Sequence, residues 1–541
     1  MQVTGGSKCL KITKEKLNRN INIERLSMSV RSRAVKIGSA FILSGAFVVT
    51  GCTGGFDDDS DVNDDNGEGG AGEADSGDSI NVALNGEPST LDPLYDIGIP
   101  AVSVFRSVFS ALTVIDENGE VGPGLAESWD TDETAETWTF VLRDDATFHN
   151  GEPVTAEDVV FSYEQGLERD DAAIGSYVSS IGAVEATGEF EVTFTMDAPY
   201  AAFDRQATLI SILPQDVYEE DPEGFANDPV GSGPYVVENW NGGDGLSLSQ
   251  YGDYHGDHGP YSEVEIRFIT DESTRANSLQ AGDLDIAQLG VANVDTLRDT
   301  EGVEVMEQES NRVLYLGFNV EGGPLADPQV REAIDLALDR GAISSDLYQG
   351  LAEPTGQMVA PTVFGYNDDI LPTDYDADSS AELLEDAGYD GTPIVLSYPA
   401  TELPQVSQLA QTVGGYLEEA GLTIELDQQE TGNFRSAWLN NELPGIYIWQ
   451  FAPSIMDADL PLSLLAAPDS TRYFNDDQID DLMVEQIATV DAEERAELLG
   501  QILQVINDES YYAPLFTDVY TFGASEGTDW EPRPDGLFIF D

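Results

Sequence analysis

Cysteine and histidine are scarce in this chain of 541 residues, which contains two cysteines and three histidines. Cys9 lies in a basic N-terminal leader and Cys52 closes it, so the rest of the protein holds no thiol pair. That absence excludes a disulfide framework and a cysteine-based metal site. We expect packing and salt to stabilise the protein instead.

Lysine is missing altogether after Cys52, where 14 arginines face 100 acidic residues and the net charge is −86. Without a basic stripe to neutralise phosphates, the chain is not expected to bind nucleic acid. Because the Debye length is only about 3 Å at 1 M salt, molar salt would screen the self-repulsion of so acidic a chain. We interpret it as the protein of an extreme halophile, whose acidic surface does not identify a ligand.

Long hydrophobic runs are also missing, since the apolar run Ile37 to Val49 spans 13 residues and is too short to cross a bilayer. It follows basic residues and ends at Thr50-Gly51-Cys52, which is typical of a secretory signal. The two nearest arginines are separated by a serine, which argues against export by the twin-arginine route. Residues 1–27 fit neither a signal nor a domain, so we expect translation to start at Met28.

The run Val49-Thr50-Gly51-Cys52 resembles a lipobox, which implies that residues 1–51 are a signal region and that Cys52 carries lipid. Residues 52–79 are rich in Asp, Glu, Gly, Ser and Asn and predict an acidic flexible tether. In the alternative interpretation Cys52 is a core thiol and residues 37–49 form a buried helix. The acidic segment directly behind the apolar run argues against that alternative.

From Ile80 onward short strands alternate with helices, and the length exceeds what one core usually serves, which predicts an α/β protein with two lobes. Glu136 to Leu142 predicts a half-buried strand, and Val184 to Met196 a hairpin turning at Thr187-Gly188. Thr155, with an acid three residues later, predicts the start of a helix. Further helices are predicted over Pro328 to Leu338, Asp378 to Ala387, Gln405 to Ala420 and Ala492 to Asn507.

A set of sequence blocks opens with Glu87 to Leu94 (EPSTLDPL) and is densest at Trp138 to Arg143 (WTFVLR), followed by Phe148 to Gly151 (FHNG). The other blocks are Phe109 to Leu112, Gly124 to Trp129, Thr155 to Ser162, Pro229 to Tyr235, Leu279 to Asp285, and Val330 to Arg340. Each block alone is explained by a turn, a core face or an amphipathic helix. In this order the set resembles the family 5 solute-binding proteins of ABC importers, a group that includes dipeptide, oligopeptide and nickel binders.

This resemblance implies a two-lobed, periplasmic-binding-protein-like (type II) α/β fold, with a hinge and an interlobe ligand cleft. Lobe I would comprise residues 80–290, lobe II residues 291–511, and residues 512–541 would return to lobe I. An ABC permease and its ATPase subunits would be the partners, and no cofactor is implied.

The family's peptide binders place in the cleft a Trp and, three residues later, an Asp that pairs with the free α-amine of the peptide. The corresponding run here is Trp449-Gln450-Phe451-Ala452, with Ala452 where that Asp would fall. Because a buried ammonium without a carboxylate is costly, we do not expect free-amine recognition in the usual manner. Either Trp449 stacks against a sugar or another flat ligand, or it fills the core of lobe II.

Two further pairs of residues are considered for the cleft. Asp96 and Gly98, just after the opening block, would approach the ligand from lobe I. Asp457 and Asp459 could supply the missing charge through a different loop path.

No catalytic residue and no metal ligand is predicted. The segment His255-Gly256-Asp257-His258 has metal-binding residue types, but its glycines and its resemblance to a surface connection favour a solvated loop. Gly523 to Gly527 matches the nucleophile-elbow pattern, yet no histidine follows His258 to act as a base. No phosphate-binding glycine loop is present, so the chain itself would not hydrolyse nucleotide.

The leading hypothesis is an extracellular solute receptor of an ABC importer, lipid-anchored at the outer face of the cell membrane, that captures a small polar solute. The solute would be peptide-like or an oligosaccharide, although chelated metals also occur on this scaffold. One alternative is a secreted α/β hydrolase, against which the lack of a nucleophile and base argues. Another is a sensory or adhesion protein on the same fold.

Overall fold

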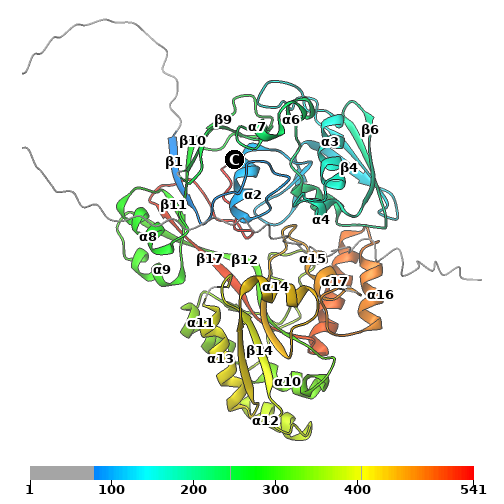
Figure 1. The fold of residues 1–541 in the computed structure, drawn as a ribbon, viewed down its shortest axis with the longest axis vertical. Helices are drawn as coiled ribbons and strands as arrows, with labels where there is room; N and C mark the ends of the chain where they lie inside the picture. Colours follow the sequence, from blue (N-terminus) through cyan, green and yellow to red (C-terminus); the bar gives the residue numbers. More distant parts are fainter. Residues whose placement is uncertain (1–77, 244, 404, 469, 541) are drawn as a thin grey trace, which may run out of the picture. The chain divides into compact units, whose positions relative to one another are not determined.

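A computed structural model describes residues 78–243, 245–403, 405–468 and 470–540 (Figure 1). The signal region, Cys52 and nearly all of the predicted tether lie outside these described residues. Within them strands and helices alternate along the chain, and the protein is of the mixed α/β class, as predicted.

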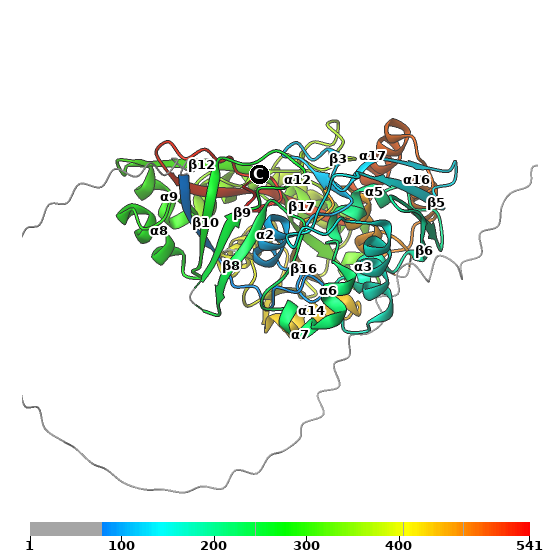
Figure 2. The same ribbon diagram turned by 90° about the horizontal axis from the view of Figure 1, so that it is seen from above.

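The described part contains one large mixed sheet of 11 strands. Its strands are β1 (Asp78–Leu84), β8 (Tyr235–Asn241), β9 (Gly245–Gln250), β10 (Tyr261–Phe268), β11 (Ile286–Gln288), β12 (Val303–Phe318), β13 (Glu353–Pro354), β14 (Ile394–Pro399), β15 (Ile424–Gln429), β16 (Ile446–Phe451) and β17 (Tyr512–Ser525). Their order is β15-β14-β16-β12-β17-β11-β1-β10-β9-β8, with β13 paired to β17. Figure 2 shows β8, β9 and β10 side by side, as their antiparallel pairing requires.

Two long strands, β12 of 16 residues and β17 of 14, join the two halves of this sheet. They pair antiparallel with each other, and Figure 1 shows them running side by side. The end of β12 pairs with β16, whereas the end of β17 pairs with β11. The ladder between them is irregular, because Glu309 faces Val519 but Val313 faces Thr517. Three residues of β12 therefore stand opposite one residue of β17, which is a β-bulge.

Two smaller sheets complete the strands of the described part. One has four strands in the order β4-β5-β7-β6, and the other is the hairpin of β2 and β3. Their ranges are β2 (Thr113–Ile115), β3 (Val121–Pro123), β4 (Ala126–Thr131), β5 (Thr137–Leu142), β6 (Ile181–Gly188) and β7 (Glu191–Met196). The predicted strand is confirmed in β5, where Trp138, Phe140 and Leu142 are buried on one face.

The predicted hairpin is confirmed, but its turn was placed too early. Gly188 pairs with Glu191, so the turn consists of Glu189 and Phe190 rather than Thr187-Gly188. The register shifts between Ala186 and Gly188. This irregularity lets β6 continue past the residues that were expected to end it.

The four helices predicted with both ends are confirmed to within about two residues at each end, as is usual for helix boundaries. The helix predicted to open at Thr155 was expected to run through Tyr163, and it extends further, to Glu168. The longer helices are α2 (Ile99–Val108), α3 (Ala156–Glu168), α8 (Glu272–Ala281), α9 (Val291–Arg298), α10 (Pro328–Leu336), α11 (Arg340–Tyr348), α12 (Ala377–Asp386), α13 (Val406–Glu419), α14 (Thr431–Leu439), α16 (Asp477–Gln486) and α17 (Ala492–Asp508). The shorter ones are α4 (Gly175–Val178), α5 (Phe203–Gln206), α6 (Gln215–Glu220), α7 (Pro222–Phe225), α15 (Asp459–Leu465) and the 3-10 turns η1 (Ala207–Leu209) and η2 (Pro324–Ala326).

Helix ends follow from local chemistry. At the start of α3, the backbone N–H and the hydroxyl of Thr155 both donate to Asp158 Oδ2, at 2.9 and 2.8 Å. Gly388 and Gly421 follow α12 and α13 with φ of +67° and +107°, a region that glycine enters without a Cβ penalty. Thr155 therefore marks the start of a helix, and Gly388 and Gly421 mark the ends of two others, as predicted.

Apolar side chains form two large buried clusters, which we call the first and the second core. The first core draws on residues 80–286 and 520–540, and the second on residues 313–516. A smaller cluster around α8, α9 and β11 includes Leu279, Leu284 and Leu297. Strands β12 and β17 connect these regions, since β12 pairs with β16 and β17 pairs with β11.

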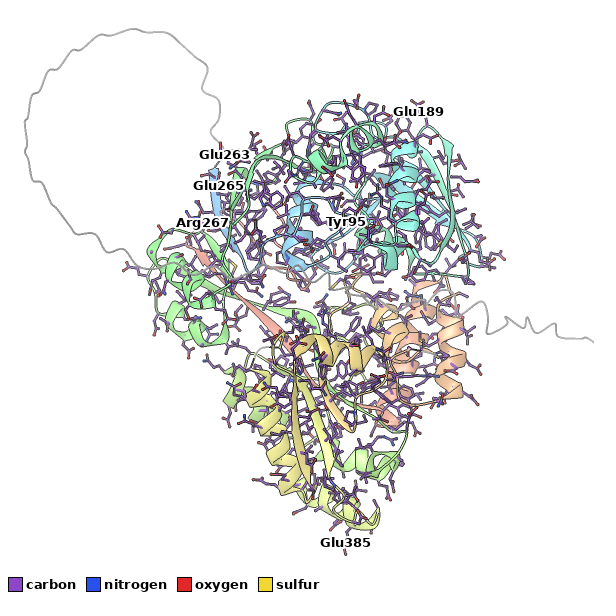
Figure 3. All side chains as sticks on the ribbon, in the orientation of Figure 1. Tyr95, Glu189, Glu263, Glu265, Arg267 and Glu385 are labelled. Atoms are coloured by element: carbon purple, nitrogen blue, oxygen red, sulfur yellow. The ribbon has the colours of Figure 1, made fainter. Side chains whose placement is uncertain are left out.

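Apart from a few buried carboxylates such as Asp92 and Asp457, the acidic residues lie mostly on the solvated faces of the elements, as strand β10 illustrates. Val264 and Ile266 are buried, while Glu263, Glu265 and Arg267 between and beside them are exposed. Figure 3 labels the three charged side chains along the outer side of this strand. The charge is thus carried by the surface and leaves the alternation that builds the core intact.

Candidate functional site

A cavity of about 370 Å³ lies where segments of the first core, the second core and β12 meet. The first core supplies the loop before α2, α2 itself, the end of β2, residues near α4 and η1, and the C-terminal segment from Arg533 to Ile539. Strand β12 supplies Asn311, and the loop after β16 supplies Ala452 and Ser454. This volume is in the usual range of about 300–1,000 Å³ for small-molecule sites.

Large apolar side chains are exposed at this cavity. Ile97, Ile99 and Val114 line it and remain 45%, 38% and 40% exposed. Exposed apolar side chains that gather at one concave place are typical of a ligand site, since a bound molecule would cover them. The walls therefore favour a ligand with apolar groups.

Asp96 lines the cavity and organises the loop that precedes α2. Its Oδ2 accepts from the Ser89 backbone N–H at 2.8 Å and from the Ser89 hydroxyl at 2.7 Å, and its Oδ1 accepts from the Gly98 N–H at 2.9 Å. Gly98 precedes the first residue of α2 and does not line the cavity. The structure thus puts one of these two predicted contacts on the wall and the other behind it; ligand contact by either stays a prediction.

Trp449 is 6% exposed and does not line the cavity. Its ring packs against Phe434 and Trp438, with centroids 5.1 and 5.7 Å apart, and the Arg435 guanidinium lies 5.9 Å from its centroid. This is the core-filling arrangement, one of the two interpretations left open by the sequence. Stacking of Trp449 on a ligand stays a prediction that this geometry does not favour.

The three residues that follow Trp449 differ in whether they line the cavity. Gln450 and Phe451 are half-buried at the end of β16 and do not line the cavity, so their ligand contacts also stay predictions. Ala452, the next residue, does line it. The cavity wall thus has an alanine at the position for which the family resemblance implied a carboxylate in peptide binders.

Asp457 and Asp459 are not on the cavity wall, which corrects the idea that they replace the missing carboxylate there. Asp457 is 0% exposed and accepts from both terminal nitrogens of Arg495, at 2.7 and 2.8 Å. Asp459 accepts from Gln486 at 2.6 Å. Both carboxylates are therefore committed to partners inside the protein.

Arg205, which belongs to the part of the chain that forms the first core, contacts the buried carboxylate of Asp457. Its Nε lies 3.5 Å from Asp457, and its Nη1 donates to the carbonyls of Gly119 and Met456, at 2.7 and 3.3 Å. The guanidinium groups of Arg205 and Arg495 both lie over the Phe364 ring, at 5.0 and 5.2 Å from its centroid. Although burial by itself would lower the pKa of Arg495, the charge of Asp457 raises it above its ordinary value.

Tyr177, from the first core, and Ser454, from the loop after β16, meet at the cavity wall. Burial raises the pKa of Tyr177, and a hydrogen bond with Ser454 partly opposes that rise. Both residues line the cavity. This contact and that of Arg205 are polar links between the first core and the loop that follows β16.

Two of the three histidines hydrogen-bond to backbone groups. His149 Nδ1 accepts from the Gly231 N–H at 3.2 Å, and its Nε2 donates to the Gly233 carbonyl at 3.1 Å. Burial lowers the pKa of His149, which favours this neutral tautomer. His258 contacts the Tyr251 carbonyl at 3.0 Å. Among the described residues, no group of His, Cys, Asp and Glu side chains is arranged to hold a metal ion.

Asn311 is the wall residue that the sequence reasoning missed most clearly. It is 3% exposed and lies in the bulge of β12. The polar triplet Ser310-Asn311-Arg312 precedes the apolar run Val313 to Leu316, and such an interruption inside a long strand was a usable signal. Tyr177 and Ser454 had no comparable signal.

Comparison with known proteins identifies the class. Residues 120–472, more than half of the chain, match the model of the bacterial extracellular solute-binding proteins, family 5. The chain belongs to this family of ABC transporter solute-binding proteins, whose members are binding proteins and not enzymes.

Among curated relatives, the probable D,D-dipeptide-binding periplasmic protein DdpA of Escherichia coli is 24% identical over 462 residues, covering 82% of this chain and 89% of its own. The glutathione-binding protein GsiB of Escherichia coli is 25% identical over 486 residues, covering 85% and 93%. Heme-binding protein A of Haemophilus influenzae is 25% identical over 440 residues, covering 73% and 79%.

Solved structures define the fold. HbpA2 of Haemophilus parasuis superposes with a TM-score of 0.79 at 20% identity, covering 86% of this chain and 99% of its own. The ABC transporter substrate-binding protein CtaP of Listeria monocytogenes gives 0.77 at 22% identity, covering 86% and 98%. The chain therefore has the two-lobed type II periplasmic-binding-protein fold predicted from its sequence blocks. In the described residues no helix is both long and apolar enough to span a bilayer.

Proposed function

We propose that this protein captures a small polar solute in the cavity beside α2 and delivers it to the permease of an ABC importer. The observation that carries this proposal is the cavity itself, which is bounded by both cores and by the connecting strand β12. A site built in this way can assemble only when the two cores approach each other. Binding and closure would then be one event.

The first and second cores correspond, in this proposal, to two moving lobes. Lobe I comprises residues 80–290 with 512–541, and lobe II comprises residues 291–511. The contacts of Arg205 with Asp457 and of Tyr177 with Ser454 would form on closure and break on opening. The bulge in β12 offers a place where the connecting strand can bend.

The predicted contacts take distinct roles in this scheme. Asp96 faces the solute from lobe I, and Gly98 holds the Asp96 carboxylate in place through its N–H. Trp449, Gln450 and Phe451 form the end of β16 and position Ala452 on the wall. The ligand would therefore meet Ala452 and Ser454 rather than the Trp449 ring.

A peptide-like solute is the favoured class. Relatives named for D,D-dipeptides and glutathione cover more than four fifths of this chain. A DppA protein of Helicobacter pylori, solved with the peptide STSA, superposes with a TM-score of 0.70 at 23% identity. The apolar side chains around the cavity also suit amino-acid side chains better than they suit an oligosaccharide.

We further propose that the mature protein is anchored to the outer face of the cell membrane by lipid on Cys52, with residues 52–79 as its tether. Metabolic labelling with a radioactive fatty acid tests this in the native host. The wild-type chain should incorporate label and Cys52→Ser should not. Equal labelling of the wild type and Cys52→Ser would contradict the proposal that Cys52 carries a lipid.

A thermal-shift screen of the whole chain in molar KCl tests solute capture. Probes would be dipeptides and tripeptides, oligosaccharides and nickel chelates. A ligand present at about 100 times its dissociation constant should stabilise the protein by about 2.7 kcal/mol. The absence of any shift across all three classes would contradict the proposal and favour a sensory or adhesion role.

A further inference from the structure

Asn311 reaches the cavity because of the bulge in β12. Glu309 and Val313 pair with β17 two residues apart, which leaves Ser310, Asn311 and Arg312 outside the regular ladder. A bulge turns side chains away from the alternation that a regular strand imposes. Asn311 is thereby placed on the wall of a cavity that otherwise belongs to the two cores.

Neighbouring segments hold Asn311 in one orientation. Its backbone N–H donates to the Pro534 carbonyl at 2.9 Å, and its Nδ2 donates to the Pro453 carbonyl at 3.0 Å. The Met456 sulfur lies 3.2 Å from the same nitrogen. A carbonyl oxygen can only accept, so the NH₂ group of the amide must face Pro453 and the amide oxygen must point elsewhere.

The oxygen of this amide has no partner. Asn311 is 3% exposed and its Oδ1 makes no hydrogen bond, although each amide oxygen can accept two. Among the described residues that line the cavity, no other has a buried side-chain nitrogen or oxygen in this state. A buried acceptor left without a donor is destabilising, so a ligand that supplies a donor gains affinity.

Three of the four acidic groups of the wall already accept hydrogen bonds or pair within the segments that carry them, whereas the fourth, Glu117, is exposed and accepts only from Asn118 Nδ2 at 3.5 Å. Both Asp96 oxygens accept from Ser89 or Gly98, and Asp116 Oδ1 accepts from two backbone N–H groups at 2.9 Å. Asp535 pairs with Arg533 at 2.8 Å. The Arg533 side chain also donates to the Ile115 carbonyl at 2.8 Å, which fixes the C-terminal segment to β2.

We propose that Asn311 is the hydrogen-bond anchor of the solute, and that the group it binds is an N–H of a neutral amide that carries an apolar side chain. This inference rests on the proposed function. A neutral donor fits because Ala452 supplies no carboxylate for an ammonium, and because Ile97, Ile99 and Val114 favour apolar groups. Solutes with a blocked α-amine are therefore accepted.

Three uncharged probes test the assignment by calorimetric titration of the whole chain in molar KCl. The parent probe is N-acetyl-leucinamide. In one analogue an ester oxygen replaces the leucine N–H, and in the other a methyl ester replaces the terminal amide. The wild-type protein should bind the parent about 10-fold more tightly than at least one analogue, as expected for one buried hydrogen bond.

The protein variants are Asn311→Ala and a matched control, Asn441→Ala. Asn441 also has a buried, unpartnered Oδ1 and an Nδ2 that donates to a backbone carbonyl, that of Ser470 at 3.0 Å, but it does not line the cavity. Asn311→Ala should lose the 10-fold preference, whereas Asn441→Ala should keep it. The preference is the ratio of two affinities measured on the same protein. A general loss of stability would weaken both affinities alike and would leave this ratio unchanged.

Two results would overturn the inference. If the wild type binds the parent and both analogues equally, or if Asn311→Ala keeps the preference, Asn311 is not the anchor, and solute capture stands. If the wild type binds none of the probes, the neutral-amide class is wrong. The thermal-shift screen with the other solute classes then decides separately whether the protein captures a solute.

Discussion

The buried pair of Asp457 and Arg495 gives the sharpest stability prediction. The carboxylate is 0% exposed, the guanidinium side chain 6%, and the two hydrogen bonds are 2.7 and 2.8 Å long. Arg495→Met keeps most of the volume but leaves Asp457 with Arg205 at 3.5 Å as its remaining cation. Removing one partner of a buried ion pair typically costs about 3–5 kcal/mol, and the remaining Arg205 should keep this loss at the lower end of that range.

The complementary change should cost much less. Asp457→Leu combined with Arg495→Met removes both charges, and buried ion pairs replaced by apolar side chains are often neutral in effect. We therefore expect the double variant to lose less stability than the two single losses added together, with a coupling of about 2–3 kcal/mol. Arg205, which remains, limits the recovery because it keeps a charge near the site.

Urea unfolding in molar KCl, followed by circular dichroism, measures these free energies. Salt at this concentration screens surface charges but has much less effect on a pair with so little exposure. A loss below about 1 kcal/mol for Arg495→Met would refute the reasoning, since that is the scale of an exposed pair. Single losses that simply add in the double variant would refute it as well.

Three other predictions concern caps, protonation and salt. Thr155→Ala should cost about 1 kcal/mol in urea unfolding, because it removes one of the two donors to Asp158; an unchanged midpoint would argue against the cap. Burial lowers the pKa of His255 to about 4, so the folded state favours neutral imidazole. Stability should be full above about pH 6.5 and fall by about 3 kcal/mol toward pH 4, and His255→Gln should flatten this profile. Dilution of KCl to about 0.1 M, where the Debye length is about 10 Å, should lower the melting temperature; insensitivity to salt would contradict the halophile interpretation.

Local signals in the sequence predicted most elements correctly. Thr155 with Asp158, and the glycines Gly388 and Gly421, mark helix ends through contacts within a few residues, and these can be recognised in one sequence. The strand at Trp138 and Phe140 follows from a period of two. The type II fold itself came from the order of the family-like blocks and not from physical periodicity.

The cavity wall could not be predicted in the same way. Asn311 lies there because β12 bulges against β17, about 200 residues later in the chain. The pairing register of two strands so far apart cannot be predicted from the sequence of either strand alone. Asp457 looked available for a ligand because Arg205 and Arg495, which bind it, are 252 and 38 residues away. Trp449 packs on α14 because of the face that β16 presents, which depends on its pairing with β12.

The most direct test of the central claim is a calorimetric titration of a dipeptide or tripeptide found in the thermal-shift screen, using the wild type and Ala452→Trp. Ala452 is a small wall residue, so an indole there should fill part of the cavity of about 370 Å³. The account predicts one solute bound per wild-type chain and at least a 10-fold weaker affinity for Ala452→Trp, with both proteins folded by circular dichroism. Equal affinity for the two folded proteins would show that the solute binds elsewhere, and would contradict the account.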